Sequence, residues 1–356
     1  MVRDNASLVV KDFKRINETI TGLKDHADRS IEATVVDINS LAKNISKLNK
    51  EIVRLENSGG ETGDLRDQRD SAVRTLSEFF KIHTYEDNKG EFVVNIVGAG
   101  SLVAGGSVNE LQAGKTSAEL KGLYEGEGRT EIFFKKKSNS PITSQLKSGK
   151  IGALIESRNN YILDLRSNLD EIAYGLTKAT NAIHERGFAN RKIPQDQNGN
   201  YILNDVSGPL NGIEFFKDLN KKEGASSQID LSDLVKGDLN NIATGLEPNS
   251  PGDNRISIAI SKLQHEKVLG EGSSTFEESY LSSVGKIGLA RKKVKIDFEQ
   301  SGGILAQAKS IKERLSGVSL DEETANMVKY QHAYDASARV IRTADEMFDS
   351  VIGMLG

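Results

Sequence analysis

The chain contains 356 residues, and its 47 basic and 51 acidic side chains give it a formal net charge of −4. With 37% hydrophobic residues it has the composition of an ordinary globular protein, which excludes a strongly basic nucleic-acid-binding protein and a disordered tail. No apolar run approaches about 18 residues, and the first residues lack a basic-then-apolar pattern, so we expect neither a membrane span nor a secretory signal. The absence of cysteine excludes disulfides, thiolate metal sites and cysteine nucleophiles.

The first predicted element is a long helix over residues 13–55. Its second half repeats apolar residues every seven positions, in one row of isoleucines (Ile31, Ile38, Ile45, Ile52) and one row of leucines (Leu41, Leu48, Leu55). Residues 57–60 end the helix, and a short helix follows around residues 65–80.

Two further long helices are predicted over residues 151–183 and 276–315. The first carries apolar residues every three or four positions, and Gly187 is a candidate C-cap. The second contains the pair Gly302-Gly303, which should weaken or bend it because each glycine costs about 1 kcal/mol relative to alanine.

The last helix, over residues 319–356, begins with a capping box formed by Ser319 and Glu322. Its apolar seam is the candidate assembly interface, which we assign to Met327, Tyr330, Tyr334, Ile341, Ala344, Phe348, Val351 and Leu355. Three basic and seven acidic side chains make this helix negative, so anionic lipid and nucleic acid are poor partners for it. The sequence therefore favours protein as the partner of the seam.

Between the helices the apolar period changes from helical to alternating. Residues 81–106 predict a hairpin that turns at residues 87–90, with Phe92, Val94 and Ile96 on one face. A second strand pair is expected at residues 118–137, and residues 188–269 are interpreted as a loop-rich insertion that contains β-structure.

These elements predict a fold that is mainly α with β: a discontinuous long-helix bundle with inserted β-containing segments and a C-terminal amphipathic helix. We expect the bundle to comprise residues 1–81, 147–187 and 271–318. We expect residues 82–146 to form a small β-hairpin-rich segment packed on it. Residues 188–270 are then a loop-rich inserted domain, and residues 319–356 a C-terminal assembly helix.

No motif assigns catalytic, cofactor-binding or metal-binding residues. Gly114-Lys115-Thr116 matches the end of a phosphate-binding loop, but Asn109 occupies the position of the required first glycine. Asp196 and Asn198 resemble the start of a calcium loop that no glutamate closes. The five histidines lack zinc-ligand spacing, so exposed or helix-end roles are expected for them. A nucleotide-binding enzyme with its site at residues 114–116 remains an alternative reading.

Four stretches together resemble the flagellar hook-associated protein 1 family. They are "GDLRDQRDSAVRTLSEFF", "SGKIGALIESRNNYILDLRSNLDEIAYGLTKATNAIHERG", "PGDN" at residues 251–254 and "SGVSLDEETANMVKYQHAYDASARVIRTADEMFDSVIGML". The resemblance covers nearly the whole chain and is weakest over residues 188–269. Members of this family open with a further amphipathic helix, so this sequence resembles a chain trimmed at its N-terminus.

The resemblance implies a structural role without catalysis, cofactor or metal. Its expected partners are other copies in a ring, the hook protein below, the next hook-associated protein or flagellin side above, and a flagellar export chaperone, with no nucleic acid or membrane. The expected location is the extracellular flagellum, reached through the flagellar export apparatus. Rod and hook proteins close with a similar helix, so another axial component of hook or distal-rod type is the alternative.

Overall fold

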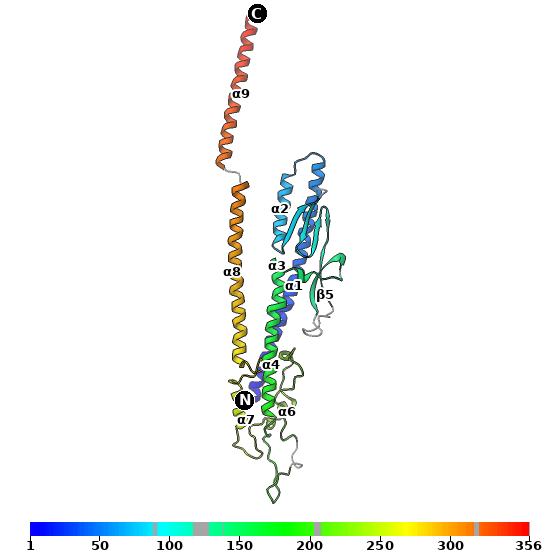
Figure 1. Cartoon of the computed structure of the whole chain (residues 1–356), viewed down its shortest axis with the longest axis vertical. Coiled ribbons are helices and arrows are strands. Elements are labelled where there is room, and N and C mark those ends of the chain that lie inside the picture. The colour runs from blue at the N-terminus through cyan, green and yellow to red at the C-terminus, as the bar shows by residue number, and fades with distance from the viewer. Residues whose placement is uncertain (88–90, 117–127, 138, 203–207, 317–319, 356) are drawn as a thin grey trace. The chain divides into compact units, whose positions relative to one another are not determined.

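The structure is a computed structural model that describes residues 1–87, 91–116, 128–137, 139–202, 208–316 and 320–355. It is mainly helical with small antiparallel sheets, which confirms the predicted fold class (Figure 1). The chain divides into two compact units, Met1–Gly285 and Lys286–Gly356.

The helices of the first unit are α1 (Val2–Asn57), α2 (Gly63–Ser77), α3 (Gly149–Glu156), α4 (Leu163–His184), α5 (Ala225–Gln228), α6 (Asp233–Gly237) and α7 (Arg255–Lys262). A π-helical turn, η3 (Ser157–Ile162), joins α3 to α4, and single 3-10 turns lie at η1 (Lys135–Lys137), η2 (Thr143–Gln145) and η5 (Leu239–Asn241). The strands are β1 (Ile82–Glu86), β2 (Phe92–Ile96), β3 (Gly100–Ala104), β4 (Ser107–Val108), β5 (Leu111–Thr116) and β6 (Arg129–Phe134). Helix α8 (Phe276–Ser316) runs from the first unit into the second, which also contains α9 (Leu320–Leu355).

Helix α1 confirms the predicted heptad rows and begins earlier than the sequence pattern indicated. Its isoleucine row is buried, with at most 2% of any of the four side chains exposed. In the leucine row Leu48 is buried, whereas Leu41 and Leu55 are half-buried. The repeat of seven predicts this burial because positions seven apart return to nearly the same face of a helix.

The first two strands form the predicted hairpin. β1 pairs antiparallel with β2, Thr84 opposite Val94, and the sheet continues in the order β1-β2-β3-β4. The expected strand pair at residues 118–137 is placed differently, because β6 pairs with β5, which begins at Leu111. Residues 118–127 of that expectation lie outside the described residues.

The first core joins the C-terminal half of α1 to α2, α3 and both sheets. Its most buried members include Ile38, Ile45, Leu76, Val94, Leu102, Ile132 and Ile151. In Figure 1, α2 and the strands lie along the half of α1 that is farther from the N-terminus. One buried ion pair crosses this region: the Arg158 guanidinium of η3 donates to Asp28 of α1 and to the carbonyl oxygen of Thr130, both at 2.6 Å.

The second core lies between the N-terminal part of α1, α4 and residues 189–235. Its members include Val10, Ala173, Ile213, Phe215, Phe216 and Leu231. Residues 188–270 were expected to contain β-structure, but among the described residues their pairing is limited to isolated bridges such as Phe216 with Leu231. Short helices and turns make up the rest of the described segment.

Buried polar side chains of α4 hold this loop-rich segment. The Asp170 carboxylate accepts hydrogen bonds from the backbone N–H groups of Gly224 and Ser226, both at 2.9 Å, and from the Ser226 hydroxyl. The Asn181 amide accepts from the N–H groups of Phe215 and Phe216 and donates to the Phe216 carbonyl oxygen. A loop without a strand ladder needs such partners because a buried backbone group without a hydrogen bond is costly.

His184 bridges two further loop positions. Its Nε2 accepts from the backbone N–H of Ala243 at 2.9 Å, so Nδ1 carries the proton and donates to the Ile213 carbonyl oxygen at 2.6 Å. The ring is fully buried, and burial lowers the pKa of His184 from its usual 6.5. His184 does end α4, as expected of a helix-end histidine, but the alternative expectation of an exposed ring is wrong here.

The interpretation of one glycine also changes. Gly187 has no positive φ and is not a C-cap; a Cβ there would lie 2.7 Å from the Cβ of Ala243, so glycine permits a close approach of the loop to α4. Helix α8 includes Gly302 and Gly303, so the pair does not end the helix, and the expected weakening or bend there stays a prediction.

Candidate assembly surface

The predicted assembly interface lies on α9, which forms over Leu320–Leu355 as the sequence indicated. Its first turn carries Asp321, Glu322 and Glu323, and acidic side chains there stabilise a helix by interacting with the positive end of its dipole. Ser319, the predicted capping residue, lies outside the described residues. The sequence of α9 therefore stabilises the helical conformation independently of any packing of its apolar face.

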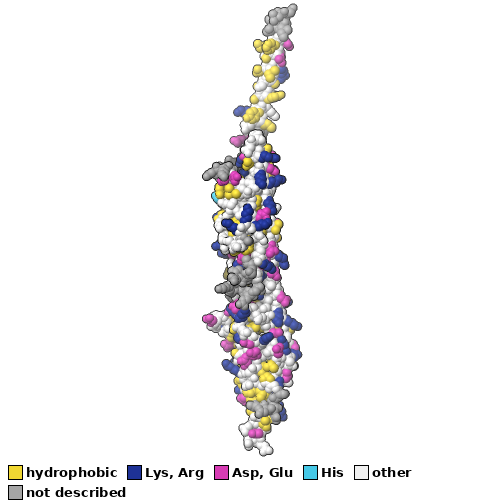
Figure 2. Space-filling model, turned by 90° about the vertical axis from the view of Figure 1, so that its right-hand side faces the viewer, with side chains coloured by type: hydrophobic (Ala, Val, Ile, Leu, Met, Phe, Trp, Pro, Cys, Tyr) yellow, Lys and Arg dark blue, Asp and Glu magenta, His cyan; other side chains and the backbone are white. Residues whose placement is uncertain are grey.

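The seam of α9 is open along its described length. Met327, Tyr330, Tyr334, Ile341 and Phe348 are 57 to 76% exposed, and Ala344 is also exposed. The side chains of Val351 and Leu355 lie outside the described part of the helix. Figure 2 shows yellow hydrophobic side chains at the surface of the α9 region.

Two apolar residues that the seven-residue repeat missed widen this seam. Val340 and Met347 are 69% and 66% exposed and each precedes a seam residue by one position. Successive residues of a helix are rotated by about 100°, which places Val340 and Met347 beside the row that contains Ala344. These two residues therefore widen the same apolar face. A search for apolar neighbours at every helical angle, beyond the strict heptad positions, would have found them.

The polar face of α9 lies opposite. His332, Arg339 and Glu346 are also spaced by seven, and they lie roughly 180° from the centre of the seam at about 100° per residue. The helix is thus amphipathic over its described length.

The alternative nucleotide site does not have the geometry of one. Gly114, Lys115 and Thr116 lie in strand β5 and pair antiparallel with Glu131, Thr130 and Arg129 of β6. A phosphate-binding loop instead connects a strand to a helix whose N-terminus faces the phosphates. The sequence match at these residues therefore carries no nucleotide site.

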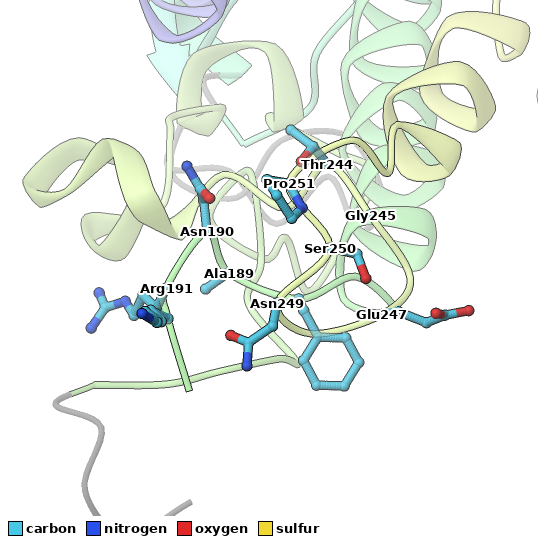
Figure 3. Close-up of a pocket in the computed structure, with 11 residues that line it drawn as sticks. Ala189, Asn190, Arg191, Thr244, Gly245, Glu247, Asn249, Ser250 and Pro251 are labelled. Carbon is cyan, nitrogen blue, oxygen red and sulfur yellow. The ribbon is translucent and has the colours of Figure 1, made fainter. Parts of the chain in front are cut away.

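A hollow of about 420 Å³ opens between residues 188–192 and 244–251 (Figure 3). In Figure 3, Arg191 and Glu247 extend on opposite sides of it. Arg191 donates to Asp238 and Asn241, and Asn249 exchanges hydrogen bonds with the backbone N–H and carbonyl oxygen of Ile193. These polar groups hold the loops together and do not converge on a reacting position.

Other ligand classes find little support in the described part of the chain. It contains no group of three or more metal-ligating side chains. The Asp196 carboxylate, the start of the possible calcium loop, accepts from the N–H groups of Asn198 and Asn200, which lowers the pKa of Asp196 and makes it the centre of a turn. Among the described helices, none has a stretch long and apolar enough to span a bilayer.

Comparison with known proteins gives two family matches. Residues 1–200 match the flagellar hook-associated protein FlgK helical domain, and residues 314–354 match the flagellar basal body rod FlgEFG protein C-terminal family. The first match covers more than half of the chain. The second coincides with α9 and so with the candidate assembly surface.

Curated relatives and a solved structure agree with these matches. The chain is 26% identical over 375 residues to flagellar hook-associated protein 1 of Bacillus subtilis, covering 100% of this chain and 71% of that protein. It is 23% identical over 414 residues to flagellar hook-associated protein 1 of Escherichia coli, covering 97% and 74%. The structure of the flagellar hook junction protein FlgK from Burkholderia pseudomallei superposes with a TM-score of 0.65 at 14% identity, covering 89% of each chain.

Proposed function

This chain belongs to the family of the flagellar hook-associated protein FlgK, as its sequence motifs indicated, and on that premise we propose that it is a structural subunit at the junction of hook and filament. The rod-type match at residues 314–354 is shared among axial proteins, whereas the match over residues 1–200 favours the hook-associated class over a hook or distal-rod protein. The subunit acts by assembly and performs no catalysis.

The observation that carries this proposal is the open apolar seam of α9. Burying a large apolar side chain contributes about 1.5 to 3 kcal/mol, so the five large described seam residues supply roughly 8 to 15 kcal/mol, as an upper estimate, when a partner covers them. An isolated helix in water has no comparable source of stability. Since α9 is acidic, the partner is protein.

The test replaces the middle of the seam. Tyr334, Ile341 and Phe348 are changed together to serine in the chromosomal copy of the protein, and incorporation at hook tips and swimming are measured. We expect both to be lost while the melting temperature stays within a few degrees. The matched control changes His332, Arg339 and Glu346 to serine on the opposite face and should assemble normally.

Deleting residues 319–356 should have the same effect as the seam variant. A truncated or triple-serine chain that still joins hook to filament would refute the assembly role of α9. Outright unfolding of the truncated chain would place α9 in the core of the monomer instead.

We also propose that residues 1–81, 147–187 and 271–318 form one discontinuous bundle, with residues 82–146 packed on it and residues 188–270 inserted. One stripe of α1 supports this, because Val2, Val9, Ile16 and Leu23 repeat every seven residues and are 41 to 61% exposed. The apolar rows of α4 that contain Leu165 and Leu176 are only half-buried. Helix α8 offers a seam of matching length, including Tyr280, Val284, Ile287, Val294 and Phe298, all of them exposed.

Disulfide cross-linking tests the bundle. The chain has no cysteine, so single pairs placed along the α1 stripe and the α8 seam report on proximity without a competing thiol. Each register is one way of matching the α1 positions to the α8 positions. We expect the cysteine pairs of one such register, spaced by seven on both helices, to form disulfides rapidly. If no pair along the two apolar rows forms a disulfide faster than pairs placed on the polar faces, in any register, the bundle is disproved.

The remaining partners follow from the family. We propose copies of this chain in a ring, the hook protein below and the next hook-associated protein or flagellin side above, with passage through the flagellar export apparatus, aided by an export chaperone, to the extracellular flagellum. Purified junctions should contain the chain between hook and filament.

A melting experiment tests the alternative of a nucleotide-binding enzyme. Because residues 114–116 lie in a strand, we expect millimolar nucleotide to leave the melting temperature unchanged.

A further inference from the structure

A second hollow, of about 560 Å³, lies at the C-terminal end of α1, where α2 and the first sheet meet it. Its described lining comes from residues 49–57 of α1, from Arg66 and Arg69 of α2, and from the loops and strands around Glu86, Phe92 and Gly105. All of these residues belong to the first unit. The hollow is far in sequence from α9 and takes no part in the assembly surface described above.

Arg69 is the unusual residue of this hollow. Only 6% of it is exposed, and its guanidinium lies 3.9 Å over the ring of Phe92, which fixes the plane of the group. Its Nη1 makes one long hydrogen bond, of 3.4 Å, to the Asn49 side chain, and its buried Nε has no hydrogen-bond partner among the described residues. Burial lowers the pKa of Arg69 below its usual value. A buried guanidinium normally has a carboxylate partner, because an unpaired buried charge is strongly disfavoured.

Arg66, one turn earlier on α2, lines the same hollow and has carboxylate partners. Its guanidinium forms ion pairs with Glu56 and Glu86, and these hydrogen bonds raise its pKa. Glu56 and Glu86 are thus already paired with Arg66. Arg69 has no ion pair with any described carboxylate, although it is the more deeply buried of the two.

The charges around the hollow favour an anion. Lys50, Arg54, Arg66 and Arg69 line it together with Glu56, Glu86 and Glu91, which leaves one net positive charge. Arg66 pairs with both Glu56 and Glu86, and this group keeps one negative charge. The cations Lys50, Arg54 and Arg69 exceed the remaining acid, Glu91, by two charges, which gives the same net positive charge of one. The hollow therefore carries net positive charge, and Arg69 is the most buried of its cations.

We propose that this hollow binds a carboxylate, which pairs with the buried Arg69 guanidinium while Lys50 and Arg54 supply positive charge around it. The flat fork of a guanidinium matches a carboxylate in a two-point hydrogen bond, and the stacking on Phe92 holds the fork in place. A phosphate dianion fits less well because its second charge meets Glu91 and the paired acids. The carboxylate comes either from an acidic side chain of a neighbouring copy of this chain or from a free carboxylic acid.

The experiment follows the Arg69 Nε–H resonance of the folded protein by NMR. Sodium acetate and sodium glutarate are titrated against sodium chloride at constant ionic strength. We expect a saturable shift of the Arg69 signal with either carboxylate, none with chloride, and none for the exposed Arg74 of the same helix. An Arg69 signal that is identical in carboxylate and chloride overturns the proposal, and so does tighter binding of inorganic phosphate than of acetate.

Variants sharpen the assignment. Arg69→Lys keeps the charge and loses the fork, so acetate affinity should fall at least tenfold, whereas Arg74→Lys leaves it unchanged. Glu91→Gln removes the competing acid and should tighten binding severalfold. Equal affinity in Arg69→Lys and wild type would show that the shift is non-specific and would refute the site.

Carbodiimide coupling then separates the two sources. It joins a lysine amine directly to a carboxylate in contact with it, and Lys50 lies at the rim of the hollow. A link from Lys50 to an acidic residue of another copy in assembled material identifies a side-chain source. Acetate binding without such a link identifies a free acid. Both results support a carboxylate site, and the outcomes that would overturn it are those of the titration and of the Arg69→Lys variant.

Discussion

The two segments that pack on the long helices are held in opposite ways. Residues 82–146 form sheets that satisfy their own backbone, and they meet α1 through apolar residues such as Val94, Leu102 and Ile132, none of which is exposed. Residues 188–270 have no ladder among their described residues, and polar side chains of α4 complete their backbone hydrogen bonds. A helix can present an apolar face to a sheet, but it must present donors and acceptors to a loop.

The largest expected effect is at Asp170. Asp170→Ala leaves two buried N–H groups without their acceptor, whereas the Ser226 hydroxyl can still donate to Asn17. Each unsatisfied buried group costs about 1 to 3 kcal/mol, so we expect a loss of roughly 2 to 6 kcal/mol. Amide exchange should accelerate at residues 213–235 while β2 and β3 stay protected. Asp164→Ala, at an exposed position of the same helix, is the control and should leave exchange unchanged. Equal acceleration in both segments would mean that the two are not held independently.

The counterpart in the first segment is apolar. Leu102 is fully buried in the first core, and Leu102→Ala should cost about 2 to 5 kcal/mol through lost burial and the cavity left behind. Here exchange should accelerate in β1 to β4 and not at residues 213–235. Val97→Ala, at a position that is 44% exposed, serves as the control. A Leu102→Ala chain with unaltered β-strand protection would contradict an apolar attachment of the sheet.

The same contrast explains what the sequence could predict. The heptad rows of α1 were predictable because apolar residues that recur every seven positions leave few alternatives to a buried helix face. The hairpin was predictable because its alternating residues and its turn agree. The α1 rows and the hairpin both contribute to the first core, which is held by apolar contacts.

Helix α4 shows why the rest was not predictable. Its expected apolar rows are half-buried, whereas its most buried face carries Arg166, Asp170, Ala173, Thr177, Asn181 and His184. Polar residues at helical spacing look like a solvent-exposed face, because nothing local distinguishes an aspartate that accepts from a distant loop from one that faces water. The apolar row of α9 could be predicted because it repeats every seven residues, whereas the exposed Val340 and Met347 lie off that strict repeat. That this face is an assembly interface stays a prediction.

His184 gives the loop-rich segment a dependence on pH that the sheet segment should lack. Its buried ring must be neutral for Nε2 to accept from Ala243, and burial lowers its pKa below the unfolded value of 6.5. Its contribution to stability is therefore complete above pH 6.5 and is lost as the pH falls through the folded-state pKa. Residues 213 and 243 should lose exchange protection as the solution is acidified below pH 6.5, while β2 and β3 should not.

The variant His184→Gln should flatten this pH dependence, and His26→Gln, at an exposed position of α1, should not. NMR titration of the His184 ring checks the direction in the unmodified chain. A folded-state pKa above 6.5 would reverse the sign and contradict the role of burial.

The smallest expected effect is at Asn39, a residue of α1 that hydrogen-bonds the backbone of the first segment much as side chains of α4 do for the second. Its amide accepts from the N–H of Leu111 at 2.9 Å and donates to the carbonyl oxygen of the same residue at 2.8 Å, as a neighbouring strand would. The site is partly buried, so water can replace the lost amide. Asn39→Ala should therefore cost only about 0.5 to 1.5 kcal/mol, the usual net value of a hydrogen bond. Urea unfolding of this variant beside Asn181→Ala, whose three backbone bonds are buried, measures how far burial separates two otherwise similar amide attachments. Equal losses would show that burial does not distinguish them and would weaken the contrast between the two segments.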